Sequence, residues 1–176
     1  MNTQLTETGL RHLERAVDLA EEALRAGDEP FGSVLVDDGG RVLREARNHV
    51  RTTGDGTRHP ELELARWAAR HLQAHDRART VVFTSGEHCP MCAAAHGWAG
   101  LGRIVYAHSS AQLTHWLTEL GAGPSPVRAL SIQEVAPGIE VQGPVPAFTE
   151  RLRSMHRALH SRPGAHPDRT PPPPGP

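Results

Sequence analysis

Two proline-marked helix starts constrain this chain more than any other feature of its sequence. Residues 59–61 read His-Pro-Glu, and residues 89–92 read Cys-Pro-Met-Cys, with 30 residues between the two starts. Proline is favoured at the first helical position, because the N–H group that it lacks would have no partner within the helix. The two segments therefore predict two helices that open with His59 and Cys89 at their cap positions.

The same two segments contain a set of metal ligands. Cys92 follows Cys89 by about one helical turn, so both thiols can face one ion, and His59 adds an imidazole nitrogen. Three such ligands predict a Zn²⁺ site with an open fourth position for water, whereas structural zinc sites are normally closed by four ligands. The chain has no further cysteine. Glu61, two residues from His59, is the expected catalytic acid and base.

Around these segments the sequence alternates between helical and strand patterns. Helices are expected over residues 8–27, 60–74, 90–100, 110–120 and 146–160. Strands are expected over residues 31–36, 41–46, 80–84 and 103–107, and more weakly over 127–135. Residues 48–58 read as a loop. This order predicts an α/β fold, a three-layer α/β/α sandwich around a mixed five-stranded sheet.

The length of 176 residues predicts one folded domain, over residues 1–161, followed by a disordered proline-rich tail over residues 162–176. Two cysteines cannot form a disulfide framework. No apolar run approaches the roughly 18 residues of a membrane span, and the N-terminus carries no signal-peptide pattern. We therefore expect a cytoplasmic protein with no membrane partner.

The charges argue against a nucleic-acid partner. Lys and Arg number 19 and Asp and Glu number 20, so no field of one sign is expected. All the basic residues are arginines, which excludes lysine chemistry. Arg151, Arg153, Arg157 and Arg162 could form a basic patch, but Glu150 interrupts them, and a solvated helix face is the simpler interpretation.

His-x-Glu followed by Pro-Cys-x-x-Cys is the signature of zinc deaminases, and this chain carries it with His88 in place of the proline before the first cysteine. Over roughly residues 16–107 the chain resembles the cytidine and deoxycytidylate deaminase superfamily, and within it bacterial guanine deaminases. The resemblance implies a cytidine deaminase-like fold. It also implies a reaction in which zinc hydroxide attacks the amine-bearing ring carbon while Glu61 transfers protons.

The resemblance also suggests substrate contacts. Phe31 lies in a Pro-Phe-Gly segment, Asn48 lies 11 residues before His59, and Trp98 lies six residues after Cys92. By resemblance, Phe31 and Trp98 wall the base and Asn48 hydrogen-bonds it. The alternatives are that Asn48 caps a turn and that both aromatic residues pack in the core. Members of this family are usually dimers or larger, so a homodimer is expected.

The expected function is hydrolytic deamination of a free nucleobase or nucleoside, with a guanine-like purine favoured. Pro60 replaces the usual alanine and removes a backbone N–H that could hold a ring carbonyl, so cytosine stays possible. One alternative is a tRNA adenosine deaminase, although those enzymes usually have a small aliphatic residue where this chain has Phe31. A remoter alternative is a catalytically silent zinc-stabilised binding module, against which the intact Glu61 argues.

Overall fold

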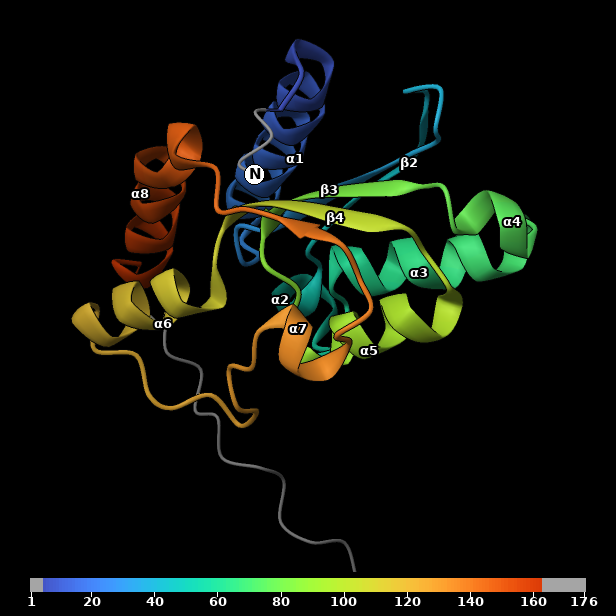
Figure 1. The fold of residues 1–176 in the computed structure, drawn as a ribbon. Coiled ribbons are helices and arrows are strands. Elements are labelled where there is room, and N and C mark those ends of the chain that lie inside the picture. Colours follow the sequence, from blue (N-terminus) through green and yellow to red (C-terminus); the bar gives the residue numbers. More distant parts are fainter. Residues whose placement is uncertain (1–4, 163–176) are drawn as a thin grey trace, which may run out of the picture.

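A mixed sheet of five strands organises the molecule, as expected from the sequence (Figure 1). The computed structural model describes residues 5–162. The strands are β1 (Gly32–Val36), β2 (Val42–Arg47), β3 (Val81–Gly86), β4 (Arg103–His108) and β5 (Val141–Gln142). Their order across the sheet is β2-β1-β3-β4-β5. Strand β1 runs antiparallel to β2 and β3, and β4 runs parallel to β3 and β5.

Helices cover both faces of the sheet, which confirms the predicted three-layer α/β/α sandwich (Figure 1). The longer helices are α1 (Glu7–Ala26), α3 (Pro60–His71), α5 (Pro90–Ala99), α6 (Ser110–Glu119) and α8 (Thr149–His160). The shorter ones are α2 (Val50–Thr53), α4 (Ala74–Arg77), α7 (Ile132–Val135) and the 3₁₀ turn η1 (Pro146–Phe148). Helices α1 and α8 lie on one face, and α3 and α5 lie on the other.

The alternation of side chains along β1 shows how the sequence builds two cores. Val34 and Val36 are buried under α1 and α8, whereas Leu35, between them, is buried against α3. Helix α1 packs closely on this strand because Gly32 has no side chain. A Cβ atom at Gly32 would lie 2.4 Å from the Cβ of Leu19. The interdigitated core fixes the edge of the sheet at which the candidate site lies.

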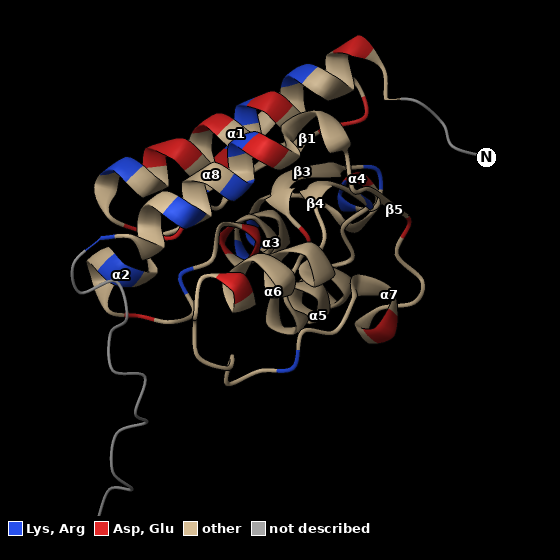
Figure 2. Ribbon diagram, turned by 90° about the vertical axis from the view of Figure 1, so that its left-hand side faces the viewer, with Lys and Arg blue, Asp and Glu red and all other residues tan. Residues whose placement is uncertain are grey.

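Helices α1 and α8 lie side by side, and both carry acidic and basic residues (Figure 2). Arg151 of α8 lies 2.7 Å from Asp18 and 2.6 Å from Glu21 of α1. Arg153 pairs with Glu119 of α6 at 2.8 Å. Arg151 and Arg153 therefore pair with acidic residues of neighbouring helices, Arg151 with α1 and Arg153 with α6.

Three details of the predicted elements are wrong. No strand forms over residues 127–135, because Ser131 and Glu134 form a capping box that starts α7 instead. The fifth strand is β5, only two residues long. The helix that begins at Pro60 ends at His71, since Leu72 adopts an extended backbone, and the expected loop over 48–58 contains the short helix α2.

One prediction concerns residues beyond this description. The predicted disordered tail begins at Arg162, and its remaining residues, 163–176, lie outside the described part of the chain. Within residues 5–162, no helix has the length and apolar character that crossing a membrane would require.

Candidate active site

The three predicted metal ligands meet where two helices begin. His59 is the N-cap of α3 and Cys89 is the N-cap of α5, each with an extended backbone and a proline directly after it. The His59 side chain makes no capping hydrogen bond to α3, and the Cys89 thiol contacts Cys92 in the first turn of α5. Cys92 is fully buried within the first turn of α5. Helices α3 and α5 pack against each other, and this packing brings the two caps together.

The distances between the ligand atoms fit one zinc ion. The Nδ1 atom of His59 lies 3.6 Å from the Sγ atoms of both Cys89 and Cys92. All three ligand atoms lie within 4.8 Å of one another. Zinc bonds of about 2.0 Å to nitrogen and 2.3 Å to sulfur, at a tetrahedral angle, separate the two atoms by about 3.5 Å, close to the observed distance. The observed spacing is therefore that of a tetrahedral site with three protein ligands.

The electrostatics of the triad favour metal binding. The hydrogen bond with Cys92 lowers the pKa of Cys89 to about 4, whereas the same contact, together with burial, raises the pKa of Cys92. Burial opposes a charged imidazole, yet the contact with Cys89 and the charge of Glu61 raise the pKa of His59 to about 9. Zinc binds thiolates and neutral imidazole, so it would displace these protons.

Glu61 lies at the second position of α3, beside the ligands and 6% exposed. Burial raises the pKa of Glu61, and the charge on His59 partly offsets this effect. The hydroxyl of Thr84, on β3, donates to its Oε1 atom at 3.1 Å, and the hydroxyl of Ser33 donates to Thr84 at 2.9 Å. A buried carboxyl held by this chain of hydrogen bonds can accept a proton and release it again.

A cavity of about 250 Å³ opens in front of this group. His59, Glu61 and Cys89 lie on its inner side, and Phe31 forms part of its wall. The rest of the lining comes mainly from residues 110–129, which include α6 and the segment after it, and from α8. Four of the seven predicted site residues thus line one cavity, and Cys92 lies directly behind it, in contact with His59.

Comparison with known proteins identifies the family. The sequence model described as "Cytidine and deoxycytidylate deaminase zinc-binding region" matches residues 6–108, more than half of the chain. The chain belongs to this deaminase family. The family description and the spacing of His59, Cys89 and Cys92 together confirm the prediction of Zn²⁺ as the cofactor.

Relatives in the family act on different substrates. The chain is 42% identical to guanine deaminase of Bacillus subtilis over 96 residues, which are 54% of this chain and 61% of that protein. It is 30% identical to a probable cytosine deaminase of Schizosaccharomyces pombe over 123 residues, 70% of this chain and 74% of that protein. It is 32% identical to the tRNA-specific adenosine deaminase of Haemophilus influenzae, over 53% of this chain and 54% of that protein.

A solved structure supports the fold of the family. The structure of guanine deaminase from Nitrosomonas europaea superposes with a TM-score of 0.68, at 20% sequence identity. The superposition covers 92% of this chain and 90% of that one. The cytidine deaminase-like fold predicted from the sequence is therefore confirmed, whereas the chain spans less than two thirds of the length of the Bacillus subtilis relative.

Asn48 is buried next to Phe31 and has one free polar atom. Its backbone N–H donates to the carbonyl of Phe31 at 2.9 Å, and its Oδ1 atom accepts from the N–H of Val50 at 2.9 Å. The Nδ2 atom has no hydrogen-bond partner in the described part of the chain. Asn48 therefore caps a turn, as the alternative expected, and keeps a donor for another group. It does not itself line the cavity.

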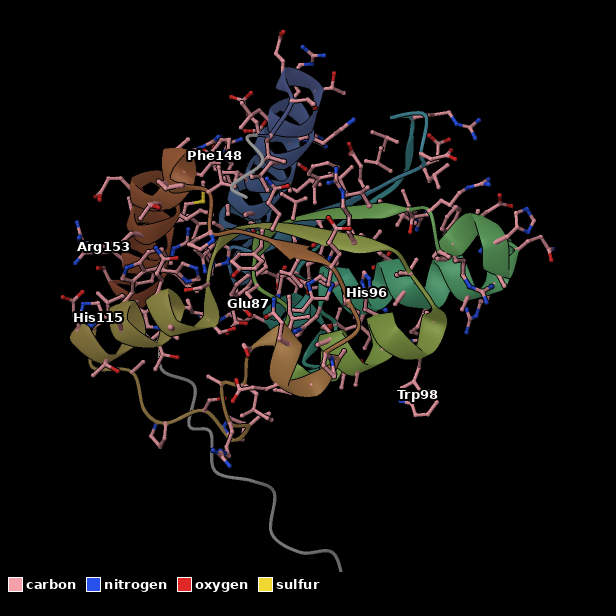
Figure 3. All side chains as sticks on the ribbon, in the orientation of Figure 1. Glu87, His96, Trp98, His115, Phe148 and Arg153 are labelled. Carbon is pink, nitrogen blue, oxygen red and sulfur yellow. The ribbon has the colours of Figure 1, made fainter. Side chains whose placement is uncertain are left out.

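Trp98 is a predicted site residue that the structure places far from the cavity lining. Its side chain is 92% exposed on the outer side of α5 and projects away from the molecule (Figure 3). It is not part of the cavity lining. The prediction that Trp98 walls the base is therefore wrong for the site formed by one chain, because the α5 surface that carries Trp98 faces away from the ligands.

Two histidines close to the ligands in sequence, His88 and His96, are buried in the fold. His96 lies under β4, where its Nε2 atom is 2.7 Å from the carbonyl of Gly102 (Figure 3). His88 is buried against His96, with their ring centroids 5.3 Å apart, and it does not line the cavity. The interpretation of His96 as a packing residue is supported by this contact.

Sequence reasoning missed residues that complete the cavity. Glu87 accepts from the backbone N–H of Ser110 at 2.8 Å and of Ile132 at 3.0 Å, so one carboxylate holds the first residues of α6 and α7 (Figure 3). Arg128 and His156 also line the cavity. The position of Glu87, two residues before Cys89, was the only sequence feature that could have pointed to it. The others lie 36 residues or more beyond Cys92, and no local pattern connects them to it.

A second cavity, of about 240 Å³, lies along the outer face of α3 and also reaches His59. Its lining includes four arginines, Arg44, Arg58, Arg66 and Arg70. Among the residues that the structure describes, only Arg44 has an ion pair with an acidic residue there, with Glu63 at 3.3 Å. The balanced overall charge gave no sign of this basic surface, because the fold collects arginines that are dispersed in the sequence.

Proposed function

We propose that the chain is a zinc-dependent hydrolytic deaminase of a small free nucleobase, with a guanine-like purine favoured. The observation that carries this proposal is the position of the Glu61 carboxyl beside a three-ligand metal site, where both line the same cavity. Names of relatives point to the same chemistry, because guanine and cytosine deaminases both remove an exocyclic amine from a ring.

The residues of this chain can carry out the proton transfers that hydrolytic deamination needs. When bound, Zn²⁺ lowers the pKa of a water molecule toward 7, which makes this water a nucleophile at neutral pH. Glu61 accepts the proton of the attacking water and gives it to the ring nitrogen next to the reacting carbon. A second transfer through Glu61 reaches the amine, which leaves as ammonia. Thr84 holds the carboxyl in place, and Phe31 offers a face to the ring.

The size of the cavity supports a small substrate. Its volume of about 250 Å³ lies just below the roughly 300–1,000 Å³ of ordinary small-molecule sites. Pro60 has no N–H to offer a ring carbonyl. Asn48 would have to turn its unpartnered Nδ2 donor into the cavity to make that contact, because it lies next to Phe31 but outside the cavity lining. Cytosine, with its single ring, is the second substrate of this class.

One observation favours a second function, deamination of adenosine in tRNA. The arginine-lined cavity on α3 borders the active-site cavity at His59, and such a surface can bind phosphates next to a base in the site. The relative from Haemophilus influenzae carries this activity in its name. The two functions differ in whether Arg66, exposed on α3, contributes to turnover.

The test is the rate of ammonia release from free guanine, cytosine, adenine and their nucleosides, compared with a tRNA anticodon stem–loop at equal concentration. The proposal predicts turnover of a free base, with no effect of Arg66→Glu. Turnover of the stem–loop alone, lost in Arg66→Glu but kept in the control Arg157→Glu on α8, would replace the proposal with the tRNA function. Any measurable turnover excludes the silent binding module.

We further propose that residues 1–161 form a single deaminase domain that works as a homodimer in the cytoplasm, as is usual in the family. The chain has a mass of 19.1 kDa, so light scattering of a dimer gives twice that value. A mass of one chain at micromolar concentration would contradict the dimer and leave the active-site proposal in place.

A further inference from the structure

His156 is a buried polar side chain on the wall of the active-site cavity. It comes from α8, is 2% exposed, and lines the same cavity as Glu61 and Phe31. Its Nε2 atom has no hydrogen-bond partner in the described part of the chain. More than about 90% of buried polar groups in proteins are hydrogen-bonded, so an unpartnered nitrogen at a cavity wall points to a missing ligand.

Aromatic rings surround this imidazole. The ring of Phe31 meets it edge-on at 5.3 Å, His108 lies at 5.6 Å and Trp116 at 6.1 Å, measured between centroids. Burial, and to a lesser degree the charge on His108, lower the pKa of His156 well below its usual value. The neutral ring offers one N–H donor and one acceptor nitrogen. Within the described part of the chain, none of these neighbours forms a hydrogen bond with its Nε2 atom.

We propose that His156 is a specificity-determining residue, which hydrogen-bonds a polar ring atom of the substrate other than the amine that leaves. The inference rests on the proposed deaminase function and adds a contact from a helix beyond the matched region 6–108. His156 therefore belongs to the C-terminal part of the chain, which supplies a wall of the cavity and carries no motif of the family.

The same wall indicates the chemical class of the substrate. Asn48 and His156 both lie next to Phe31, one through a backbone hydrogen bond and one through ring contact. Each has a buried nitrogen without a partner. A ring that packs against Phe31 in the cavity therefore meets the imidazole of His156, whereas Asn48 does not line the cavity. This selects a purine or an oxo-substituted pyrimidine over an aminated ring that lacks further polar atoms.

Two substitutions test the contact. His156→Leu removes hydrogen bonding at similar volume, and His156→Gln keeps a polar end. The substrates are guanine with 7-deazaguanine, 3-deazaguanine and 2-aminopurine, which each lack one polar atom, and cytosine with 4-aminopyrimidine, which lacks the oxo group. We expect His156→Leu to lower kcat/KM on the preferred base roughly 10- to 100-fold, chiefly through KM, with partial rescue in His156→Gln.

The decisive result is the combination of protein and substrate changes. For the wild type, kcat/KM on one analogue should be lower than on the parent base, by the same factor that His156→Leu loses on the parent base. His156→Leu should have equal kcat/KM on this analogue and on the parent base, because the contact is already absent. The control is His12→Leu. The Nε2 atom of His12 is also buried without a partner, but its ring packs on Phe83, away from the cavity. This control should leave the preference among the analogues unchanged.

Zinc content, melting temperature and equilibrium binding of the analogues are measured for each variant, so that a loss of folding is recognised. If His156→Leu binds zinc and keeps the wild-type preference among analogues, the inference is wrong while the deaminase function stands. If the wild type neither binds nor deaminates any of these bases, the proposed free-base function fails, and the inference fails with it.

Discussion

The two halves of the candidate site are built in different ways. The inner half comes from the first turns of α3 and α5 and from β3, and it holds the metal ligands and Glu61. The outer half comes from α6, α8 and the segment between α6 and α7, and it encloses the cavity. The family match covers the inner half and ends at residue 108. From this contrast we propose that the reaction depends on local sequence motifs, whereas the choice of substrate depends on the C-terminal part of the chain.

The largest effect is expected from a ligand of the inner half. Cys89→Ser removes one of three zinc ligands, so the zinc content should fall from about one ion per chain to nearly none, and activity should disappear with it. Elemental analysis of the purified protein measures this content. Met91→Leu, a change within the same segment at a residue outside the ligand group, is the control and should keep its zinc. Stoichiometric zinc in Cys89→Ser would show that the ligand set is wrong.

Glu61→Gln separates the chemistry from the metal. The variant should keep zinc and fold, because the carboxyl is not one of the clustered ligands, yet it should lose turnover by about 10⁴-fold. Steady-state ammonia release measures the loss. Glu63→Gln, two residues away on the same helix and half-exposed, should stay near the wild-type rate. Near-normal turnover in Glu61→Gln would remove the proton-transfer role.

These two variants rely on features that the sequence alone could supply. A proline at the first helical position and a cysteine one turn later are local rules, so His59, Cys89, Cys92 and Glu61 were predicted without knowledge of the tertiary structure. The three layers and the mixed sheet were predicted from the alternation of helical and strand patterns along the chain. Phe31 was placed by resemblance to the family.

The outer half could not be predicted in the same way. Trp98 was assigned to the pocket by resemblance to the family, from its position six residues after Cys92, but its side chain is 92% exposed on the outer side of α5. The apolar pattern over residues 127–135 suggested a strand, whereas the capping box at Ser131 formed a helix. His156 reaches the cavity only because α8 packs beside α6, a contact between segments far apart in sequence.

A moderate effect is expected from Thr84→Val, which removes the hydroxyl that donates to Glu61 without changing the shape of the residue much. Loss of this bond loosens the carboxyl, and kcat should fall by about 3- to 10-fold with zinc content unchanged. Thr80→Val, which removes a buried hydroxyl bonded to the carbonyl of Arg77 just before β3, should lower stability but not kcat. Equal kcat values for both variants would argue against a positioning role for Thr84.

The smallest effect concerns the attachment of α8. Arg151→Ala removes the contacts with Asp18 and Glu21 on α1, and since these groups are partly exposed, the free energy of unfolding should fall by only about 0.5–1 kcal/mol. Thermal unfolding should show a decrease in Tm of about 1–4 °C, with zinc content unaffected. Arg157→Ala, exposed on the same helix, is the control. A loss of zinc in Arg151→Ala would contradict the separation of the two halves.

The central claim is that His59, Cys89 and Cys92 hold zinc in an open site, and X-ray absorption at the zinc edge of the loaded protein tests it most directly. The account predicts two sulfur atoms near 2.3 Å, one imidazole near 2.0 Å and one further light atom from solvent. The imidazole count decides the outcome, since a second imidazole would close the site. Two sulfur atoms with two imidazoles would therefore contradict the account, because the zinc would then be structural and Glu61 would have no water to act on.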